Sequence, residues 1–196
     1  LDGTLQFDRE TGEAQGSYII TPSGLTSDNY NISFEQGTLE ITQKAITITA
    51  DSQTKVYGED DPELTYQITS GNLVDGDSLT GELSRVTGED VGDYVIGQNT
   101  LNNNNYDITY MGANLTVTAK PITVTANAVS KYHGTVDPAL TYQITEGSLE
   151  EGDTLSGGLT RENGEDIGRY DILQGDLANN NYDITYKKAD FTIKPA

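Results

Sequence analysis

The sequence predicts an all-β protein made of tandem, small, elongated β domains arranged as a rod. Three observations support this fold class. Residues 44–119 and 120–195 align without a gap, and 41 of the 76 positions are identical. Apolar and polar residues alternate over short segments, which is the two-residue period of half-buried strands. No segment carries apolar residues at helical spacing over three turns. Repeats of this kind bury their cores by stacking on their neighbours.

The repeat frame divides the chain into segments. The first 43 residues fit the second half of a repeat, with Tyr18 over Tyr94 and Tyr30 over Tyr106. A unit of 76 residues buries only about 60% of the surface of its unfolded chain, so we expect each unit to depend on its neighbours. The predicted domains are 1–43, the C-terminal half of a preceding repeat; 44–119, one whole repeat; and 120–196, a second whole repeat. We expect the chain to be part of a longer array.

Six strands are expected in the first whole repeat. Ile46 and Ile48 alternate with threonines, and four later segments show the same period. Those segments are 64–69, 94–96, 106–110 and 115–118. A sixth strand is expected over 79–85, where Gly81 interrupts the pattern. Turn-forming residues occupy 58–62, 75–77, 88–90 and 102–105. Two arrangements remain open, a β-sandwich-like domain and an elongated β-grasp-like sheet as in mucin-binding repeats.

The connection between the whole repeats is short. Ala119, Lys120 and Pro121 alone join the strand that ends at Thr118 to the one that begins at Ile122. Proline fixes its own φ and holds the preceding residue in extended geometry. Such a connector leaves little room for bending, which favours the rod.

Charge and composition exclude several classes of function. The net charge is −20 and no segment is basic, so nucleic acid is not an expected partner. No apolar run is long enough for direct membrane insertion. The chain has no cysteine, which excludes disulfides, thiolate nucleophiles and cysteine-bound zinc. This composition suits either the cytosol or an exported bacterial protein.

Acidic turns are the only segments with the composition of a metal site. Asp75, Asp77, Glu89 and Asp90 are candidate calcium ligands, because calcium prefers hard oxygen donors. No twelve-residue calcium loop is present, and solvated turns are the alternative. Glu89 and Asp90 are adjacent, so they do not form the separated carboxylate pair of a glycosidase. We expect no cofactor other than calcium.

Neither the histidine nor the tyrosines indicate catalysis. His133 stands where the preceding repeat has Tyr57, which points to an amphipathic filler and not to a base. The strand tyrosines could stack on sugars, but they lie on the apolar face. We therefore predict that Tyr106 and Tyr182 are more than two-thirds buried, and that the protein is not an enzyme.

Several motifs occur in the first whole repeat, and most of them recur in the second and in part in residues 1–43. They are Lys55-Val56-Tyr57-Gly58, Asp61-Pro62-x-Leu64-Thr65-Tyr66, Gly71-x-Leu73-x-x-Gly76-Asp77-x-Leu79-x-Gly81, Arg85, Gly88-Glu89-x-x-Gly92-x-Tyr94-x-Ile96 and Asn104-Asn105-Tyr106-x-Ile108. In this respect the chain resembles tandem MBG domains of the YGX type, from large exported bacterial adhesin-like surface proteins. The last repeat departs at His133, where the family has tyrosine. The resemblance implies an extracellular location, at the bacterial cell surface or secreted. It assigns no catalytic residue.

Three functions follow as hypotheses. The first is a stalk or spacer that projects a distal binding domain of an adhesin. The second is that the repeats themselves bind host glycan or protein. The third is a rod stiffened by calcium. The incomplete segment 1–43 would expose Tyr30 and Ile32 on an open sheet. Either a neighbouring chain completes this sheet, a self-association that we favour, or the structural module is offset from the repeat frame and these strands pack on the next unit.

Overall fold

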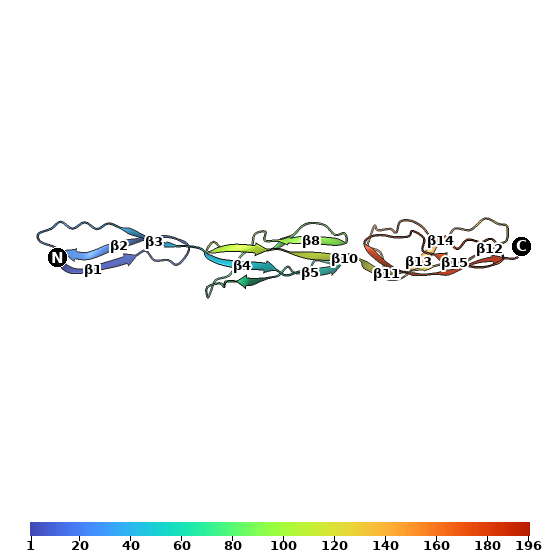
Figure 1. The fold of residues 1–196 in the computed structure, drawn as a ribbon, viewed down its shortest axis with the longest axis horizontal. Coiled ribbons are helices and arrows are strands. Elements are labelled where there is room, and N and C mark those ends of the chain that lie inside the picture. The colour runs from blue at the N-terminus through green and yellow to red at the C-terminus, as the bar shows by residue number, and fades with distance from the viewer. The chain divides into compact units, whose positions relative to one another are not determined.

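The computed structural model describes residues 1–196, and its regular structure consists of strands only (Figure 1). Seventeen strands form five small sheets. The all-β prediction is confirmed. No helix of the length and apolarity that a membrane span requires is present.

The chain packs as two compact units that do not coincide with its sequence repeats. One unit comprises residues 1–51, 64–84 and 96–113; the other comprises residues 52–63, 85–95 and 114–196. The boundary runs through the repeat 44–119, because each whole repeat carries two separate sheets. Each unit is described below by itself.

The repeat 120–196 lies entirely in the second unit. Its strands are β11 (Lys120–Ala126), β12 (Val129–Tyr132), β13 (Tyr142–Glu146), β14 (Thr160–Arg161), β15 (Gly168–Leu173), β16 (Tyr182–Lys187) and β17 (Ala189–Lys194). They form a three-stranded sheet in the order β13-β11-β16 and a four-stranded sheet in the order β12-β17-β15-β14. β11 pairs in parallel with β16, and β12 pairs in parallel with β17. The beginning and the end of the repeat are therefore hydrogen-bonded to each other.

The repeat 44–119 has the same strand order. Its strands are β4 (Lys44–Ala50), β5 (Gln53–Val56), β6 (Tyr66–Ser70), β7 (Ser84–Arg85), β8 (Gly92–Gly97), β9 (Tyr106–Met111) and β10 (Ala113–Thr118). The sheets β6-β4-β9 and β5-β10-β8-β7 reproduce those of the other repeat strand for strand. The expectation that gapless alignment means one shared fold is confirmed.

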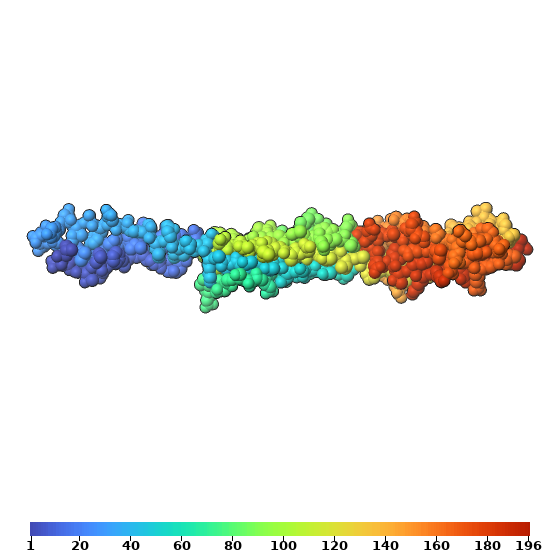
Figure 2. Space-filling view, viewed as in Figure 1, coloured from blue at the N-terminus to red at the C-terminus, as the bar shows by residue number.

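Alternating residues of these strands build the cores. Residues 120–196 carry two buried clusters, and Figure 2 shows this segment in yellow to red. One cluster comprises Ile122, Val124, Leu177 and Tyr182; the other comprises Ala126, Ile172, Phe191 and Ile193. The first unit contains the equivalent of the cluster around Ile122 and Tyr182, and its buried members are Ile46, Ile48, Leu101 and Tyr106. Tyr106 is 2% exposed and Tyr182 is 6% exposed, so their predicted burial is confirmed.

Three details of the strand prediction are wrong. The strand expected over 79–85 is limited to β7, with an isolated bridge between Thr80 and Asn102. Gly81 lies between this bridge and β7, and its φ is 87°. A Cβ at this position would lie 2.2 Å from the carbonyl oxygen of Thr100. Second, β5 shows no apolar alternation, and it is a strand because it pairs in parallel with β10. Third, the connector is shorter than expected, because β11 begins at Lys120 and only Ala119 separates it from β10.

Residues 1–43 form a three-stranded antiparallel sheet of their own. Its strands are β1 (Asp2–Arg9), β2 (Gly16–Thr26) and β3 (Gly37–Ile41), in the order β1-β2-β3. The counterpart of β9, residues 30–35, is not a strand here. In the whole repeats β9 is an edge strand whose one partner is β4, and residues 1–43 contain no counterpart of β4. Tyr30 is 72% exposed, and completion by another chain stays a prediction.

We expect Tyr106→Ala to lower the free energy of unfolding by about 3–5 kcal/mol, because it removes a buried aromatic side chain from the first unit's core. Urea denaturation followed by circular dichroism measures this. Tyr106→Phe is the matched control. It keeps the ring and loses only the hydroxyl bonds to Asp77 and Val74, so its expected cost is about 1–3 kcal/mol. An alanine variant as stable as the wild type would contradict the assignment of Tyr106 to the core.

Candidate functional site: the junction between repeats

The motif Gly88-Glu89-Asp90-x-Gly92-x-Tyr94 encloses an arginine. Nη1 of Arg85 donates to the carbonyl oxygen of Gly88 at 2.6 Å, and its guanidinium lies 5.2 Å from the centre of the Tyr94 ring. The Tyr94 hydroxyl donates to the carbonyl oxygen of Asp90 at 2.7 Å, which closes the turn. Gly88 has a φ of 149°, and a Cβ would lie 2.2 Å from the tyrosine ring. Only glycine allows the ring to approach this closely.

The same arrangement occurs three times in the chain. Arg161 contacts Gly164 and Tyr170 in the last repeat, and Arg9 contacts Gly12 and Tyr18 in residues 1–43. We call this arginine, with the glycine carbonyl and the tyrosine ring that contact it, the arginine cage. The cage is a property of the repeat and not of one site.

In the whole repeats a buried lysine joins this cage. Lys55 is 5% exposed, and its Nζ donates to Asp61 at 2.8 Å, to the carbonyl oxygen of Glu59 at 3.0 Å and to Glu89. Arg85 also bonds both oxygens of Asp61, at 2.6 and 2.9 Å. Two cations thus share two carboxylates, and we call these four residues the lysine cluster. The second copy is Lys131, Asp137, Arg161 and Glu165.

The ion pairs shift the pKa values of their members. Hydrogen bonding from Arg85 lowers the pKa of Asp61 from 3.8 to about 2, and Lys55 contributes in the same direction. Burial alone would lower the pKa of Lys55, but its bonds to Asp61 and Glu89 raise it. In the second copy, Arg161 and then Lys131 lower the pKa of Asp137 to about 2. All four residues therefore carry full charge at neutral pH.

A tyrosine next to this cluster enters the core of the following repeat. The amide of Tyr57 donates to the carbonyl oxygen of Thr118 at 2.8 Å, which extends the β5–β10 ladder. The Tyr57 ring meets the Tyr182 ring edge-on, with centroids 5.5 Å apart. The hydroxyls of Tyr57 and Tyr182 both donate to Oδ2 of Asp153, at 2.9 and 2.5 Å. Tyr57 is thus part of the cluster built around Ile122 and Tyr182.

Asn181 makes a second contact across the same junction. Its Oδ1 accepts from the amide of Val91 at 2.9 Å, and its Nδ2 donates to Asp90 at 2.8 Å. Within the following repeat, its first residue, Lys120, forms an ion pair with Glu150. Burial and the bond to Asp153 raise the pKa of Tyr182 to about 12, so its hydroxyl stays a donor over the physiological range.

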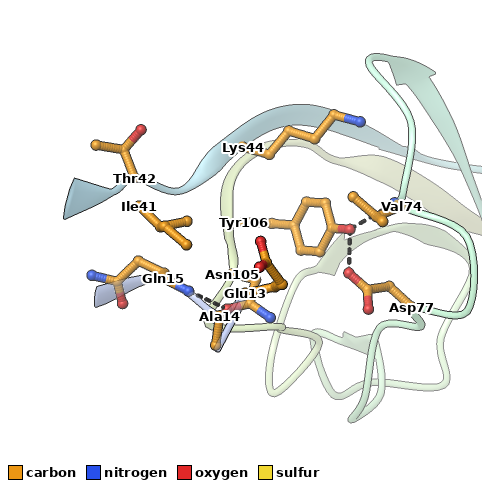
Figure 3. A pocket seen from close by; sticks show the side chains of 10 residues that line it. All are labelled: Glu13, Ala14, Gln15, Ile41, Thr42, Lys44, Val74, Asp77, Asn105 and Tyr106. Atoms are coloured by element: carbon orange, nitrogen blue, oxygen red, sulfur yellow. Dashed lines mark hydrogen bonds between the residues drawn. The ribbon is translucent and has the colours of Figure 1, made fainter. Parts of the chain in front are cut away.

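Residues 1–43 meet the repeat 44–119 through equivalent groups. The amide of Gln15, which aligns with Val91, donates to Oδ1 of Asn105 at 2.9 Å. The Tyr106 hydroxyl donates to Asp77 at 2.5 Å and accepts from the amide of Val74 at 2.8 Å (Figure 3). A pocket opens beside these residues in the first unit. Its lining comprises Glu13, Ala14, Gln15, Ile41, Thr42, Lys44, Val74, Asp77, Asn105 and Tyr106.

Comparison with known families decides the affiliation of the chain. The profile of the MBG domain (YGX type) matches residues 1–40, 46–116 and 122–192. The chain belongs to the MBG family. No curated protein matches the sequence.

The MBG repeats do not bring the predicted calcium ligands together. Glu89 is paired with Lys55 and Arg85, Asp77 accepts from Tyr106, and Asp90 accepts from Asn181. No group of three histidine, cysteine, aspartate or glutamate side chains is arranged around a common point. Calcium binding stays a prediction. His133 is exposed, and its backbone amide donates a hydrogen bond to the carbonyl oxygen of Lys194.

Sequence reasoning missed the lysine cluster and the role of Tyr57. The signal was present, because Lys55, Asp61, Arg85 and Glu89 are four of the positions identical in both whole repeats. Their separation in sequence hid the cluster, since Lys55 and Glu89 are 34 residues apart. The parallel pairing of β5 with β10, which positions Tyr57, has no signature in hydrophobic alternation.

We expect Tyr57→Ala to destabilise the junction by about 1–3 kcal/mol, because it removes an edge-on aromatic contact and a hydrogen bond to a carboxylate. Hydrogen exchange of the Glu150 and Asn181 amides measures this locally. Tyr132→Ala is the control, since Tyr132 is 59% exposed and outside the junction. Unchanged exchange at both amides would contradict the assignment.

We expect the lysine cluster to make the protein acid-labile between about pH 4 and pH 2. The folded pKa of Asp137, about 2, lies below its ordinary value of 3.8. Its contribution is therefore present above about pH 4 and is lost as the pH falls toward 2. Asp137→Asn should flatten the decline in unfolding free energy over this range, while Asp183→Asn, at an exposed position, should leave it unchanged. Equal slopes in the two variants would contradict this.

Proposed function

We propose that this chain is a spacer segment of an exported bacterial surface adhesin, in which MBG repeats form a stalk that projects a distal binding domain. We place the protein outside the cell, at the surface or secreted. Family membership supports a repetitive surface-protein segment. We propose no catalytic activity for it.

The observation that carries this proposal is the junction. The tyrosine at the centre of the Lys-Val-Tyr-Gly motif completes the core of the next repeat, and Asn181 ties the two repeats by a second pair of bonds. Side chains of one whole repeat thus contact side chains of the next. A spacer that holds a distance depends on such interfaces, because the stability of a repeat array includes terms between nearest neighbours.

Acidity also supports a spacer. The net charge of −20 keeps a crowded, repetitive surface protein soluble and limits association between neighbouring arrays. The same charge repels anionic lipid and nucleic acid.

The spacer proposal predicts an elongated particle in solution. A compact chain of this length has a radius of gyration of about 16 Å. Small-angle scattering of the chain at moderate salt should give a clearly larger value, because each repeat is fixed to the next through its junction. A radius near that of a compact chain would contradict the spacer. Tyr57→Ala is the informative variant, since a loosened junction should broaden the distribution of interatomic distances.

The competing function is that the repeats themselves bind host glycan or protein. A glycan array probed with the 1–196 chain, labelled at its N-terminus, distinguishes the two. The spacer proposal predicts no reproducible ligand. Reproducible binding that is lost on mutation of an exposed aromatic such as Tyr132 would replace it with the binding function.

A further inference from the structure

The first and last segments of a whole repeat pair with each other in one register. In the repeat 120–196, β11 pairs in parallel with β16, and β12 pairs in parallel with β17. Lys120 lies opposite Tyr182 at one end, and Tyr132 lies opposite Lys194 at the other. In both ladders each residue of the first segment thus faces the residue 62 positions later. We call these two paired segments, 120–132 and 182–194, the parallel seam.

Backbone bonds extend the seam at both of its ends. The amide of Lys120 donates to the carbonyl oxygen of Asn181 at 2.9 Å, and the amide of His133 donates to the carbonyl oxygen of Lys194 at 2.9 Å. Ala119 alone separates β11 from the preceding strand β10, so no slack chain lies between these two strands. Tension along the chain therefore reaches the seam directly at Lys120.

The parallel pairing determines how the seam is loaded. Tension pulls the first segment by its N-terminal end and the last segment by its C-terminal end. Because two parallel segments begin at the same end of a ladder, these two points lie at opposite ends of the seam. The pull then acts along the strands, and the hydrogen bonds between them share the load. In an antiparallel pair both points would lie at one end, and the bonds would break one after another.

Each segment of the seam is also held by a strand outside it. β11 lies between β16 and β13, and β17 lies between β12 and β15. Both outer neighbours, β13 and β15, pair antiparallel with the seam strand beside them. The first segment is thus anchored in one sheet and the last segment in the other, and the seam is where the two segments would slide past each other.

Buried side chains resist such sliding. A shift by one residue exchanges the two faces of a strand, so buried side chains would move to the solvent face. Val124 on β11 and Phe191 on β17 are both fully buried. Lys131 on β12 is buried as well, and sliding would separate its ammonium group from the carboxylates of Asp137 and Glu165. The lysine cluster therefore holds the register of the seam.

The repeat 44–119 keeps the same register. In the first unit Lys44 on β4 lies opposite Tyr106 on β9, and in the second unit Val56 on β5 lies opposite Thr118 on β10. Both pairings are parallel, and their partners are again 62 residues apart. The pairing of first and last segments is therefore a property of the whole repeat.

We propose that each whole repeat is a mechanical clamp, in which the parallel pairing of its first and last segments keeps the repeat folded while the chain is under tension. In the repeat 120–196 the load is carried by six paired positions between β11 and β16 and by four between β12 and β17. The clamp resists force along the chain and yields to force that separates the two segments sideways. This property follows from the strand pairing and does not depend on the spacer function.

Single-molecule pulling of the 1–196 chain from different pairs of residues tests the clamp. The chain has no cysteine, so two introduced cysteines are the only thiols to which handles attach. Pro121→Cys with Lys194→Cys places the handles at opposite ends of the seam and shears it. Pro121→Cys with Asp183→Cys, or Tyr132→Cys with Lys194→Cys, places them on facing residues at one end and peels it. All four positions are exposed.

We expect the shear pair to rupture at a force at least about twofold higher than either peel pair at the same loading rate, because the ladder bonds share the load. Forced unfolding reports the barrier to unfolding, so one folded protein can resist force differently in different directions. Complete unfolding between the shear handles should release up to about 260 Å of chain.

The three double-cysteine variants control one another. Each peel pair shares one substitution with the shear pair, and equal midpoints of thermal unfolding show that the variants are equally stable before the handles are attached. The two peel pairs lie at opposite ends of the seam, so one of them suffices if the other is destabilised. A shear force equal to or below that of a peel pair of equal stability would overturn the proposal. Stepwise release of the repeat between the shear handles, below the peel force, would do the same.

Discussion

The buried ammonium group of Lys55 is the constraint on which the organisation of a repeat depends. A buried charge costs several kcal/mol unless counter-charges reach it. Asp61 follows the turn after β5, and Glu89 comes from a loop 34 residues away, so both segments must meet at the lysine. Arg85 prevents the two carboxylates from repelling each other, since it bonds both. The cluster thus fixes β5, a strand with little apolar content, against the rest of its repeat.

Fixing β5 determines where Tyr57 lies. Its amide continues the ladder with Thr118, and its ring then falls on Tyr182 in the next repeat. A repeat of 76 residues buries a smaller share of its surface than a large domain does, and here an aromatic side chain of the neighbouring repeat adds to its core. The boundary between the compact units falls inside the repeat 44–119, which carries two separate sheets. Stability in such a chain is a sum of repeat terms and neighbour terms.

The sequence was sufficient for the fold class and for much of the core. Alternation identified β4, β6, β9 and β10, and the repeated Asn-Asn-Tyr entry correctly placed Tyr106 and Tyr182 in the core. The parallel pairing could not be predicted from the sequence. Alternation indicates that a segment is a strand, but it does not indicate which strand it pairs with. β5 and Lys55 were missed for this reason. Glu89, one of the predicted calcium ligands, forms ion pairs with Lys55 and Arg85 of the same repeat.

The central claim is that the lysine cluster and the tyrosine junction act together across the boundary between repeats. A double-mutant cycle of Asp61→Asn and Tyr57→Ala tests it most directly, with the hydrogen-exchange free energy of the Glu150 amide as the readout. That amide donates to the Tyr182 hydroxyl at 2.7 Å and lies in the repeat that follows both mutations. The account predicts a coupling energy of about 0.5–3 kcal/mol, because Asp61 acts on the next repeat through the position of Tyr57. Strictly additive effects of the two mutations at this amide would contradict it.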